Sequence, residues 1–142
     1  MDIGIGGDHA GFRYKERLIR FLKEKGHKVE DYGPDSEDAV DYPDHVHPLA
    51  SSIAAKDHDF GILICGSGNG VAITANKHEN VRAALCWVGE IASLARKHNN
   101  ANVLCLPARF IAYEYAESLV EIFLGTDFEG GRHGKRVVKI NC

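Results

Sequence analysis

The stretch Phe60-Gly61-Ile62-Leu63-Ile64-Cys65-Gly66-Ser67-Gly68-Asn69-Gly70 decides how the chain is interpreted. An apolar, β-like run ends on a cysteine, and glycine then occupies every second position. A helical pattern follows over residues 71–77. The start of a helix supplies unpaired backbone N–H groups and a positive dipole end, which would stabilise a thiolate or an anionic ligand beside Cys65. The stretch therefore predicts the reaction centre of an enzyme.

Other β-like runs lie on both sides of this stretch. The candidate strands cover residues 2–6, 28–32, 60–65, 81–86 and 102–106. Because strands alternate with helical patterns, the sequence predicts a parallel sheet with helices on both faces. Right-handed crossovers then give a doubly wound α/β fold, a three-layer α/β/α sandwich with a five-stranded parallel sheet.

Apolar residues at helical spacing mark the helices. They occur over residues 14–22, 91–98 and 112–123, and Gly26 suits the end of the first helix. The acidic stretch 34–44 contains turn formers and has no apolar period, so we expect a loop there.

Two glycine-rich loops follow the first and third candidate strands, namely Gly6-Gly7-Asp8-His9-Ala10-Gly11 and Cys65-Gly66-Ser67-Gly68-Asn69-Gly70. Ligands of doubly wound sheets bind beyond the carboxyl ends of the strands, near the point where the winding direction reverses. The first and third strands usually flank that point. We therefore expect the two loops to meet at a ligand site.

Length and composition are those of an ordinary globular domain. The 142 residues, 44% hydrophobic and 26% charged, fit a single domain over 1–142. A net charge of −3 argues against a nucleic-acid partner, and the apolar runs are too short for a membrane. Met1-Asp2-Ile3-Gly4 lacks the features of a signal peptide. We expect a cytoplasmic protein with free cysteines, of which Cys86 and Cys105 belong to the core.

The Cys65 loop matches none of the common glycine-rich signatures. The P-loop pattern G-x-x-x-x-G-K-[ST] is absent, and a dinucleotide fingerprint would need glycine where Val71 stands. A tyrosine-phosphatase-type loop would need arginine at the same position. The plain alternative is a tight turn around a buried cysteine, but three alternating glycines and Ser67 exceed what a turn needs.

Two histidines are candidates for acid–base work. In Asp8-His9, a carboxylate beside an imidazole can orient a hydroxyl and exchange a proton with it, although Asp8 also suits a cap of the first helix. In His98-Asn99-Asn100, the histidine ends a helix, where the dipole favours it and asparagine is a common stop. The residues alone leave both interpretations open.

The tail 128–142 is rich in glycine, then basic, and ends on an apolar run over 137–140. Arg132 and Arg136 are four residues apart, so on a helix they share a face and can clamp one phosphate. Gly134 weakens any helix there, and a solvated basic tail is the plain alternative. We expect the apolar end to pack against the body of the protein or a second subunit.

The run Asp44-His45-x-His47 superficially resembles a metal site. On a helix, however, side chains two positions apart point in different directions. Pro48 is adjacent, and no partner ligands stand at metal spacing. We therefore expect no metal.

Together these stretches resemble one family from end to end: ribose-5-phosphate isomerase type B, with the related allose- and galactose-6-phosphate isomerases. The matching segments are Gly7-Asp8-His9-Ala10-Gly11-Phe12, Asp41-Tyr42-Pro43, Ile64-Cys65-Gly66-Ser67-Gly68-Asn69-Gly70, Ala75-Asn76-Lys77, Arg82-Ala83-Ala84, His98-Asn99-Asn100-Ala101-Asn102-Val103 and Glu129-Gly130-Gly131-Arg132-His133.

The resemblance implies a role for each matching residue. Cys65 would be the base that moves a proton between C1 and C2 of the open-chain sugar, with Ser67 supporting the thiolate. His98 would open the furanose ring. One branch of the family lacks the cysteine and uses a glutamate after the last loop glycine; Val71 stands there, so the chain resembles the cysteine branch. The enediolate oxygens would be held by the amides of Gly66, Ser67, Gly68, Asn69 and Gly70.

The remaining implied roles concern the substrate. Asp8 and Tyr42 would lie near the sugar oxygens, and Asn99 would contact the sugar. The phosphate would be bound by His9, Arg109, Arg132 and Arg136. The resemblance further implies a homodimer whose active sites combine both subunits, with no cofactor.

The function expected from residues and resemblance is aldose–ketose isomerisation of ribose 5-phosphate and ribulose 5-phosphate through an enediolate. An allose- or galactose-6-phosphate isomerase is the first alternative, since the loops that set sugar length are not decodable from one sequence. A non-enzymatic sugar-phosphate-binding protein and a thiol-redox protein are the others. The redox alternative lacks a second cysteine near Cys65 in the sequence.

Overall fold

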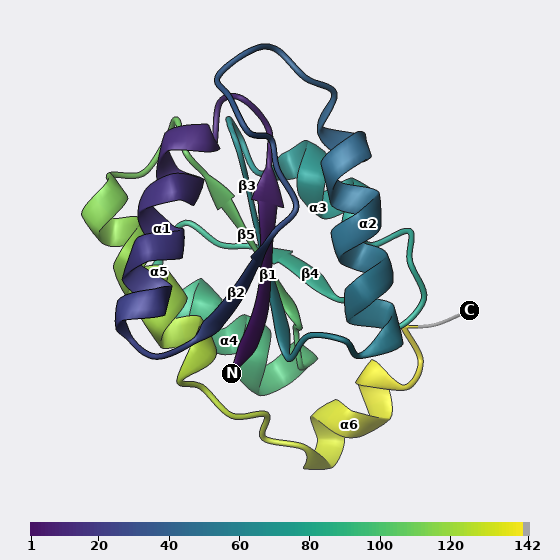
Figure 1. Ribbon diagram of the computed structural model, residues 1–142. Helices are drawn as coiled ribbons and strands as arrows, with labels where there is room; N and C mark the ends of the chain where they lie inside the picture. The colour runs from purple at the N-terminus through teal and green to yellow at the C-terminus, as the bar shows by residue number, and fades with distance from the viewer. Residues whose placement is uncertain (141–142) are drawn as a thin grey trace.

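The computed structural model describes residues 1–140 and contains one five-stranded parallel sheet (Figure 1). The strand order is β2-β1-β3-β5-β4, so the winding direction reverses between β1 and β3. This confirms the doubly wound α/β fold. The strands are β1 (Asp2–Gly7), β2 (Lys28–Asp31), β3 (Phe60–Cys65), β4 (Ala83–Leu85) and β5 (Val103–Pro107).

The helices cover both faces of the sheet, as the ribbon shows (Figure 1). They are α1 (Phe12–Glu24), α2 (Tyr42–Ala55), α3 (Asn69–Ala75), α4 (Gly89–Asn99), α5 (Tyr113–Leu124) and α6 (Gly131–Val137). None of these helices is both long and apolar enough to cross a membrane.

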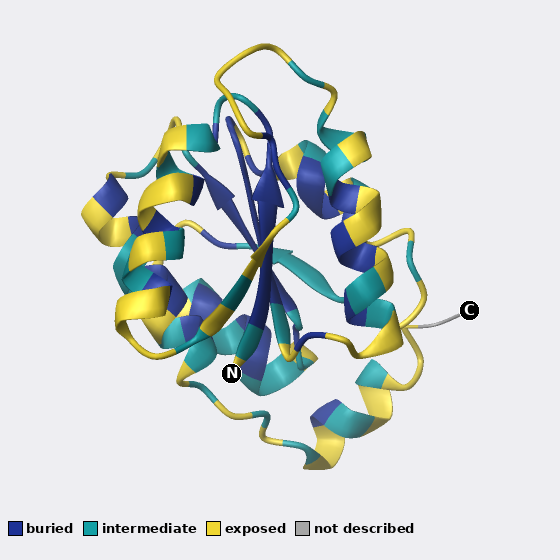
Figure 2. Ribbon diagram, viewed as in Figure 1, coloured by how far each residue is buried: buried dark blue, intermediate teal, exposed yellow. Residues whose placement is uncertain are grey.

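Alternate residues of the central strands point to opposite faces of the sheet and belong to two separate hydrophobic cores. Ile62 and Ile64 of β3 pack with α1, α4 and α5 on one face, while Leu63 and Cys65 pack with α2 and α3 on the other. The central strands are consequently buried along their length, in contrast to the exposed outer faces of the helices (Figure 2). Burial on both faces explains why β3 is a continuous apolar run.

One expectation needs correction. The stretch 34–44 is not a loop throughout, because α2 begins at Tyr42 and continues past Pro48. This helix was not anticipated, although Val46, Leu49, Ala50 and Ile53 give it a buried stripe at helical spacing. Prolines and histidines between the apolar residues obscured that stripe. The tail is helical over Gly131–Val137 despite Gly134.

The loops after β1 and β3 meet, as expected. The N–H of Asp8 donates to the carbonyl oxygen of Ile64 across 3.1 Å. A Cβ atom at Gly7 would lie 1.9 Å from that same oxygen, so only glycine permits this approach. The contact fixes the Asp8 loop directly beside the Cys65 loop.

Candidate active site

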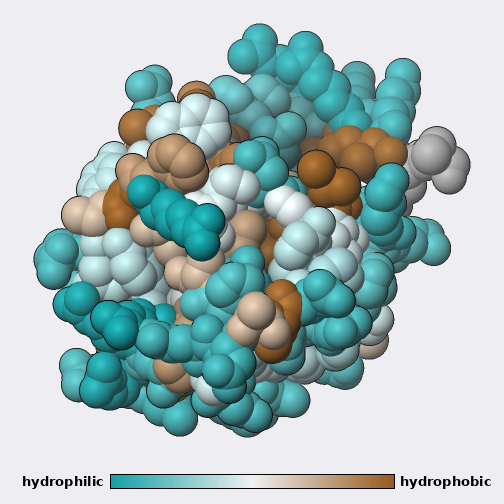
Figure 3. Space-filling model, turned by 90° about the horizontal axis from the view of Figure 1, so that it is seen from above, coloured by the Kyte–Doolittle hydropathy of each residue, from teal (hydrophilic) through white to brown (hydrophobic). Residues whose placement is uncertain are grey.

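A cavity of about 550 Å³ opens at the carboxyl ends of β1, β3 and β5. Figure 3 views the molecule from this end, where apolar side chains lie among hydrophilic ones. The cavity is lined by Asp8, His9, Ala10, Tyr42, Cys65, Gly66, Ser67, Gly70, Arg109 and Phe110. Most of the residues expected at the site therefore converge here, from four separate segments of the chain.

Cys65 is the last residue of β3 and lines this cavity, with 4% of its surface exposed. Its Sγ atom accepts a hydrogen bond of 3.1 Å from the backbone N–H of Gly68. A backbone donor therefore points directly at the sulfur atom. The hydroxyl of Ser67 instead accepts the N–H of Asn69 across 3.4 Å, so the direct support for sulfur comes from Gly68.

Arg109 and Tyr42 close two sides of the cavity through contact with glycines. A Cβ atom at Gly66 would lie 3.3 Å from the Arg109 guanidinium, and one at Gly70 would lie 2.6 Å from the Tyr42 ring. The backbone N–H of Arg109 donates to the carbonyl oxygen of Gly66 across 3.1 Å, which fixes the backbone of Arg109 beside the loop. An exposed cation thus lines the same cavity as the thiol, which suits an anionic ligand.

Asp8 and His9 face the cavity from the loop after β1. The buried Asp8 carboxylate accepts a hydrogen bond of 3.1 Å from the backbone N–H of Gly11, just before α1 begins. Asp8 therefore both binds a backbone donor at the start of this helix and lines the cavity. The N–H of Val40 donates to Nδ1 of His9 across 3.3 Å. In a neutral ring this leaves the proton on Nε2, which makes Nε2 a donor.

The other described cysteines belong to the core, as expected. Burial raises the pKa of the Cys86 thiol to about 12 and that of Cys105 well above its ordinary value. Cys65, Cys86 and Cys105 are free thiols, and Cys142 lies outside the described residues. Among the three described cysteines, only Cys65 lines the cavity.

Gly68 and Asn69 lie in the Cys65 loop at the start of α3, but four other expected residues lie at the other end of the sheet. His98 and Asn99 end α4, just before the amino end of β5, whereas Cys65 pairs with Pro107 at its carboxyl end. Arg132 and Arg136 are exposed on α6, which lies beside the end of α4 (Figure 1). One chain therefore does not bring His98, Asn99, Arg132 and Arg136 to the cavity that contains Cys65.

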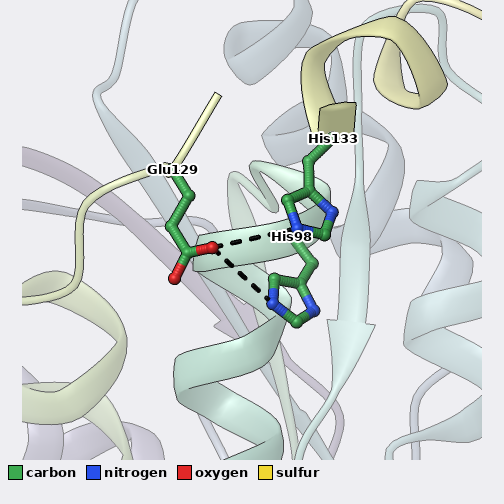
Figure 4. A group of neighbouring side chains, drawn as sticks. All are labelled: His98, Glu129 and His133. Carbon is green, nitrogen blue, oxygen red and sulfur yellow. Dashed lines mark ion pairs between the residues drawn. The ribbon is translucent and has the colours of Figure 1, made fainter. Parts of the chain in front are cut away.

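His98 has two neighbours that the sequence did not single out as functional (Figure 4). The Oε2 atom of Glu129 lies 3.8 Å from Nε2 of His98 and 3.8 Å from Nε2 of His133. The two imidazole rings stack, with centroids 4.1 Å apart and planes inclined by 6°. Glu129 precedes α6, so its spacing to His133 is not that of a helical turn, and no local pattern in the sequence signals this contact.

Two histidine groups bear on metal binding. In the run 44–47, Nδ1 of His45 lies 2.9 Å from the carbonyl oxygen of Tyr32, while Nδ1 of His47 lies 2.8 Å from Nε2 of His78. The two side chains thus point to different partners. His98, Glu129 and His133 offer ligand atoms within 4.8 Å of one another. Because a histidine ligates in its ring plane, one ion does not lie in both stacked planes at once. That no metal is used stays a prediction.

Fold and cavity together define a doubly wound α/β protein with a thiol-centred site at the switch point of its sheet. The chain matches the ribose/galactose isomerase family over residues 3–140 and belongs to it.

Individual relatives are similar to this chain over almost their full length. A ribose 5-phosphate isomerase structure from Thermotoga maritima superposes with a TM-score of 0.96 at 49% identity, covering 99% of this chain and 97% of that one. A ribose-5-phosphate isomerase B from Mycoplasma genitalium with bound ribulose-5-phosphate is 45% identical with a TM-score of 0.94, over 98% and 93% of the chains. Ribose-5-phosphate isomerase B of Escherichia coli is 41% identical over 99% of this chain and 94% of its own.

Proposed function

We propose that the protein is an aldose–ketose isomerase that interconverts ribose 5-phosphate and ribulose 5-phosphate. Family membership supports this, as does the similar Mycoplasma genitalium protein with bound ribulose-5-phosphate. A cavity that joins a thiol, backbone donors and an arginine has the parts such a reaction requires: a base, donors for a developing oxyanion and an anchor for phosphate.

Cys65 would act as the base. In the open-chain aldose its thiolate takes the proton from C2, and the electron pair moves through C2–C1 onto the carbonyl oxygen, giving an enediolate. The proton returns to C1 while the O2 proton passes to O1, which leaves the ketose. No electrons leave the sugar, so the step needs no redox partner. The N–H of Gly68 donates to the sulfur across 3.1 Å and holds in place the atom that would take the proton.

The loop amides from Gly66 to Gly70 would hold the enediolate oxygens, with Asp8 and Tyr42 beside the sugar hydroxyls. One well-aimed donor to an oxyanion is typically worth about 10²–10³ in rate. His9 and Arg109 would bind the phosphate at the same cavity, since both offer donors toward it.

Ring opening and the remaining phosphate contacts would come from a second copy of the chain. His98, Asn99, Arg132 and Arg136 lie at the far end of the sheet from Cys65. A two-fold dimer would bring this end of one chain to the Cys65 cavity of the other, giving two composite sites. The exposed Val138 (79%) and Ile140 (50%) near the end of the tail support a partner that covers them.

The observation that carries the proposal is the buried Cys65 thiol, which has a backbone donor and lines the same cavity as Arg109. The test compares kcat/KM of the wild type and Cys65→Ala on ribose 5-phosphate, allose 6-phosphate and galactose 6-phosphate. We expect ribose 5-phosphate to be preferred, and turnover to vanish in Cys65→Ala while phosphate-ligand binding persists. Substantial residual activity in Cys65→Ala would exclude Cys65 as the base.

Other results would favour the alternatives. A preference for a hexose phosphate would make the protein an allose- or galactose-6-phosphate isomerase. Binding of sugar phosphate without turnover would indicate a non-enzymatic role. We also propose a single isomerase domain over 1–142 in the cytoplasm; the free thiols of Cys65, Cys86 and Cys105 support a reducing compartment.

A further inference from the structure

Glu129 is fixed beside His98 by the backbone on both sides of it. Its N–H donates to the carbonyl of Lys97 across 3.1 Å, which attaches the segment to the last turn of α4. Gly130 and Gly131 follow with φ values of +66° and +54°, a conformation that side chains disfavour. The turn they form starts α6 and returns His133 onto the ring of His98. The run Glu129-Gly130-Gly131-Arg132-His133 thus places two side chains against the imidazole of His98.

The two stacked rings differ in their surroundings. The His133 side chain is 8% exposed, whereas that of His98 is 38% exposed. Burial lowers the pKa of His133, and the positive charges of His98, Arg132 and Arg136 lower it further, against an opposing effect of Glu129. His133 therefore stays neutral at neutral pH. The single negative charge of Glu129 is left to act on His98, the ring that solvent and ligand can reach.

We propose that Glu129 and His133 are positioning residues for His98, setting the orientation of its ring for opening the sugar ring. This inference rests on the proposed function. The carboxylate of Glu129 lies 3.8 Å from Nε2 of His98, and the flat face of His133 fixes the plane of the His98 ring.

The chemistry separates this role from that of Cys65. Opening the furanose breaks the C1–O4 bond, delivers a proton to O4 and removes one from the C1 hydroxyl, leaving the aldehyde. Ribulose 5-phosphate needs no such step, because its C5 hydroxyl carries the phosphate and the ketose stays acyclic. Exchange of its C1 proton with solvent requires only a base and an oxyanion cradle. A defect confined to His98 therefore spares this exchange.

The experiment measures both reactions on the full-length protein: turnover of ribose 5-phosphate, and exchange of the C1 protons of ribulose 5-phosphate in D₂O by NMR. We expect Glu129→Gln to lower kcat on ribose 5-phosphate by roughly 10- to 100-fold, a part of the 10²–10⁴ that acid–base groups supply, with exchange within about threefold of wild type. Glu129→Asp, which keeps the charge, should recover part of the loss. His133→Phe, which keeps a flat ring, should lose less than His133→Ala.

Asp127→Asn is the matched control, because Asp127 is an exposed carboxylate two residues earlier in the same segment. It should leave both reactions unchanged. If Glu129→Gln and His133→Ala lose exchange in step with turnover, or lose neither, the inference is overturned. A wild-type protein that neither isomerises nor exchanges overturns the proposed function, and the inference with it.

Discussion

The backbone N–H of Gly68 donates to the sulfur of Cys65 across 3.1 Å, and the geometry that permits this is closed to other residues. Gly68 has φ = +75°, and a Cβ atom there would lie 2.3 Å from Cδ1 of Leu85. Position 68 therefore requires glycine for two reasons: its backbone is left-handed, and a side chain there would collide with Leu85.

Gly68→Ala should therefore reduce stability and activity together. A left-handed conformation costs an L-residue about 1–2 kcal/mol, and the contact with Leu85 adds to this. Urea unfolding measures the loss of stability, and kcat measures the loss of activity. Gly134→Ala is the control: nothing lies within 4 Å of its Cβ position in α6, so it should stabilise slightly and leave kcat unchanged. Equal effects of the two substitutions would contradict this account.

Alkylation should distinguish the three described cysteines. Cys65 lines the cavity and has a backbone donor to sulfur, whereas the pKa of Cys86 is raised to about 12 by burial. At pH 8 the thiolate fraction of Cys86 is then on the order of 10⁻⁴. Iodoacetamide at pH 8 should modify Cys65 first, as read by peptide mass mapping, and ribulose 5-phosphate should protect it. Cys86 reacting as fast as Cys65 would disprove the prediction.

Arg109→Ala should weaken substrate binding. A hydrogen bond to a charged group contributes about 1.5–3 kcal/mol, which corresponds to roughly 10- to 150-fold in KM for ribose 5-phosphate. Arg13→Ala removes an exposed arginine that pairs with Glu37 instead, and serves as the control. An unchanged KM in Arg109→Ala would remove Arg109 from the phosphate site.

Mixing two inactive variants should restore activity if sites are shared between subunits. Cys65→Ala and His98→Ala each disable both sites of their own dimer. After subunit exchange, half of the dimers are mixed and each has one intact site, so activity should recover to about a quarter of wild type. Unmixed variants are the controls. No recovery despite demonstrated exchange would mean that Cys65 and His98 do not work in one composite site.

His133 should make the contact between α6 and α4 sensitive to acid. Its pKa is lowered in the folded protein, so the folded state binds fewer protons there than the unfolded state. The stability gained is fully present above the ordinary histidine pKa of 6.5 and is lost as pH falls through the lowered folded value. The melting temperature should therefore fall less between pH 7.5 and pH 5 in His133→Phe than in the wild type. Parallel declines would contradict this.

The sheet and one half of the site were predictable because their signals are local. A strand buried on both faces is apolar along its length, and the loop glycines follow it at once, so the Phe60–Gly70 stretch determines both the fold and the position of the thiol. The helix α2 was missed since Pro43, Pro48 and two histidines interrupt its apolar pattern.

The residues that contact His98 could not be predicted from the sequence, for a different reason. Its stacking on His133 depends on how α6 packs against α4, a tertiary relation between segments about 35 residues apart that no local pattern records. The separation of His98 from Cys65 was deducible in principle, because a helix between parallel strands returns the chain to the amino end of the sheet.

The distance between Cys65 and His98 also bears on when the protein works. If a second chain supplies the missing groups, a newly made chain is folded but inert until it meets another. Specific activity then falls when the protein is diluted below the dissociation constant of the pair. Turnover then depends on dimer formation, and therefore on the concentration of the protein in the cell.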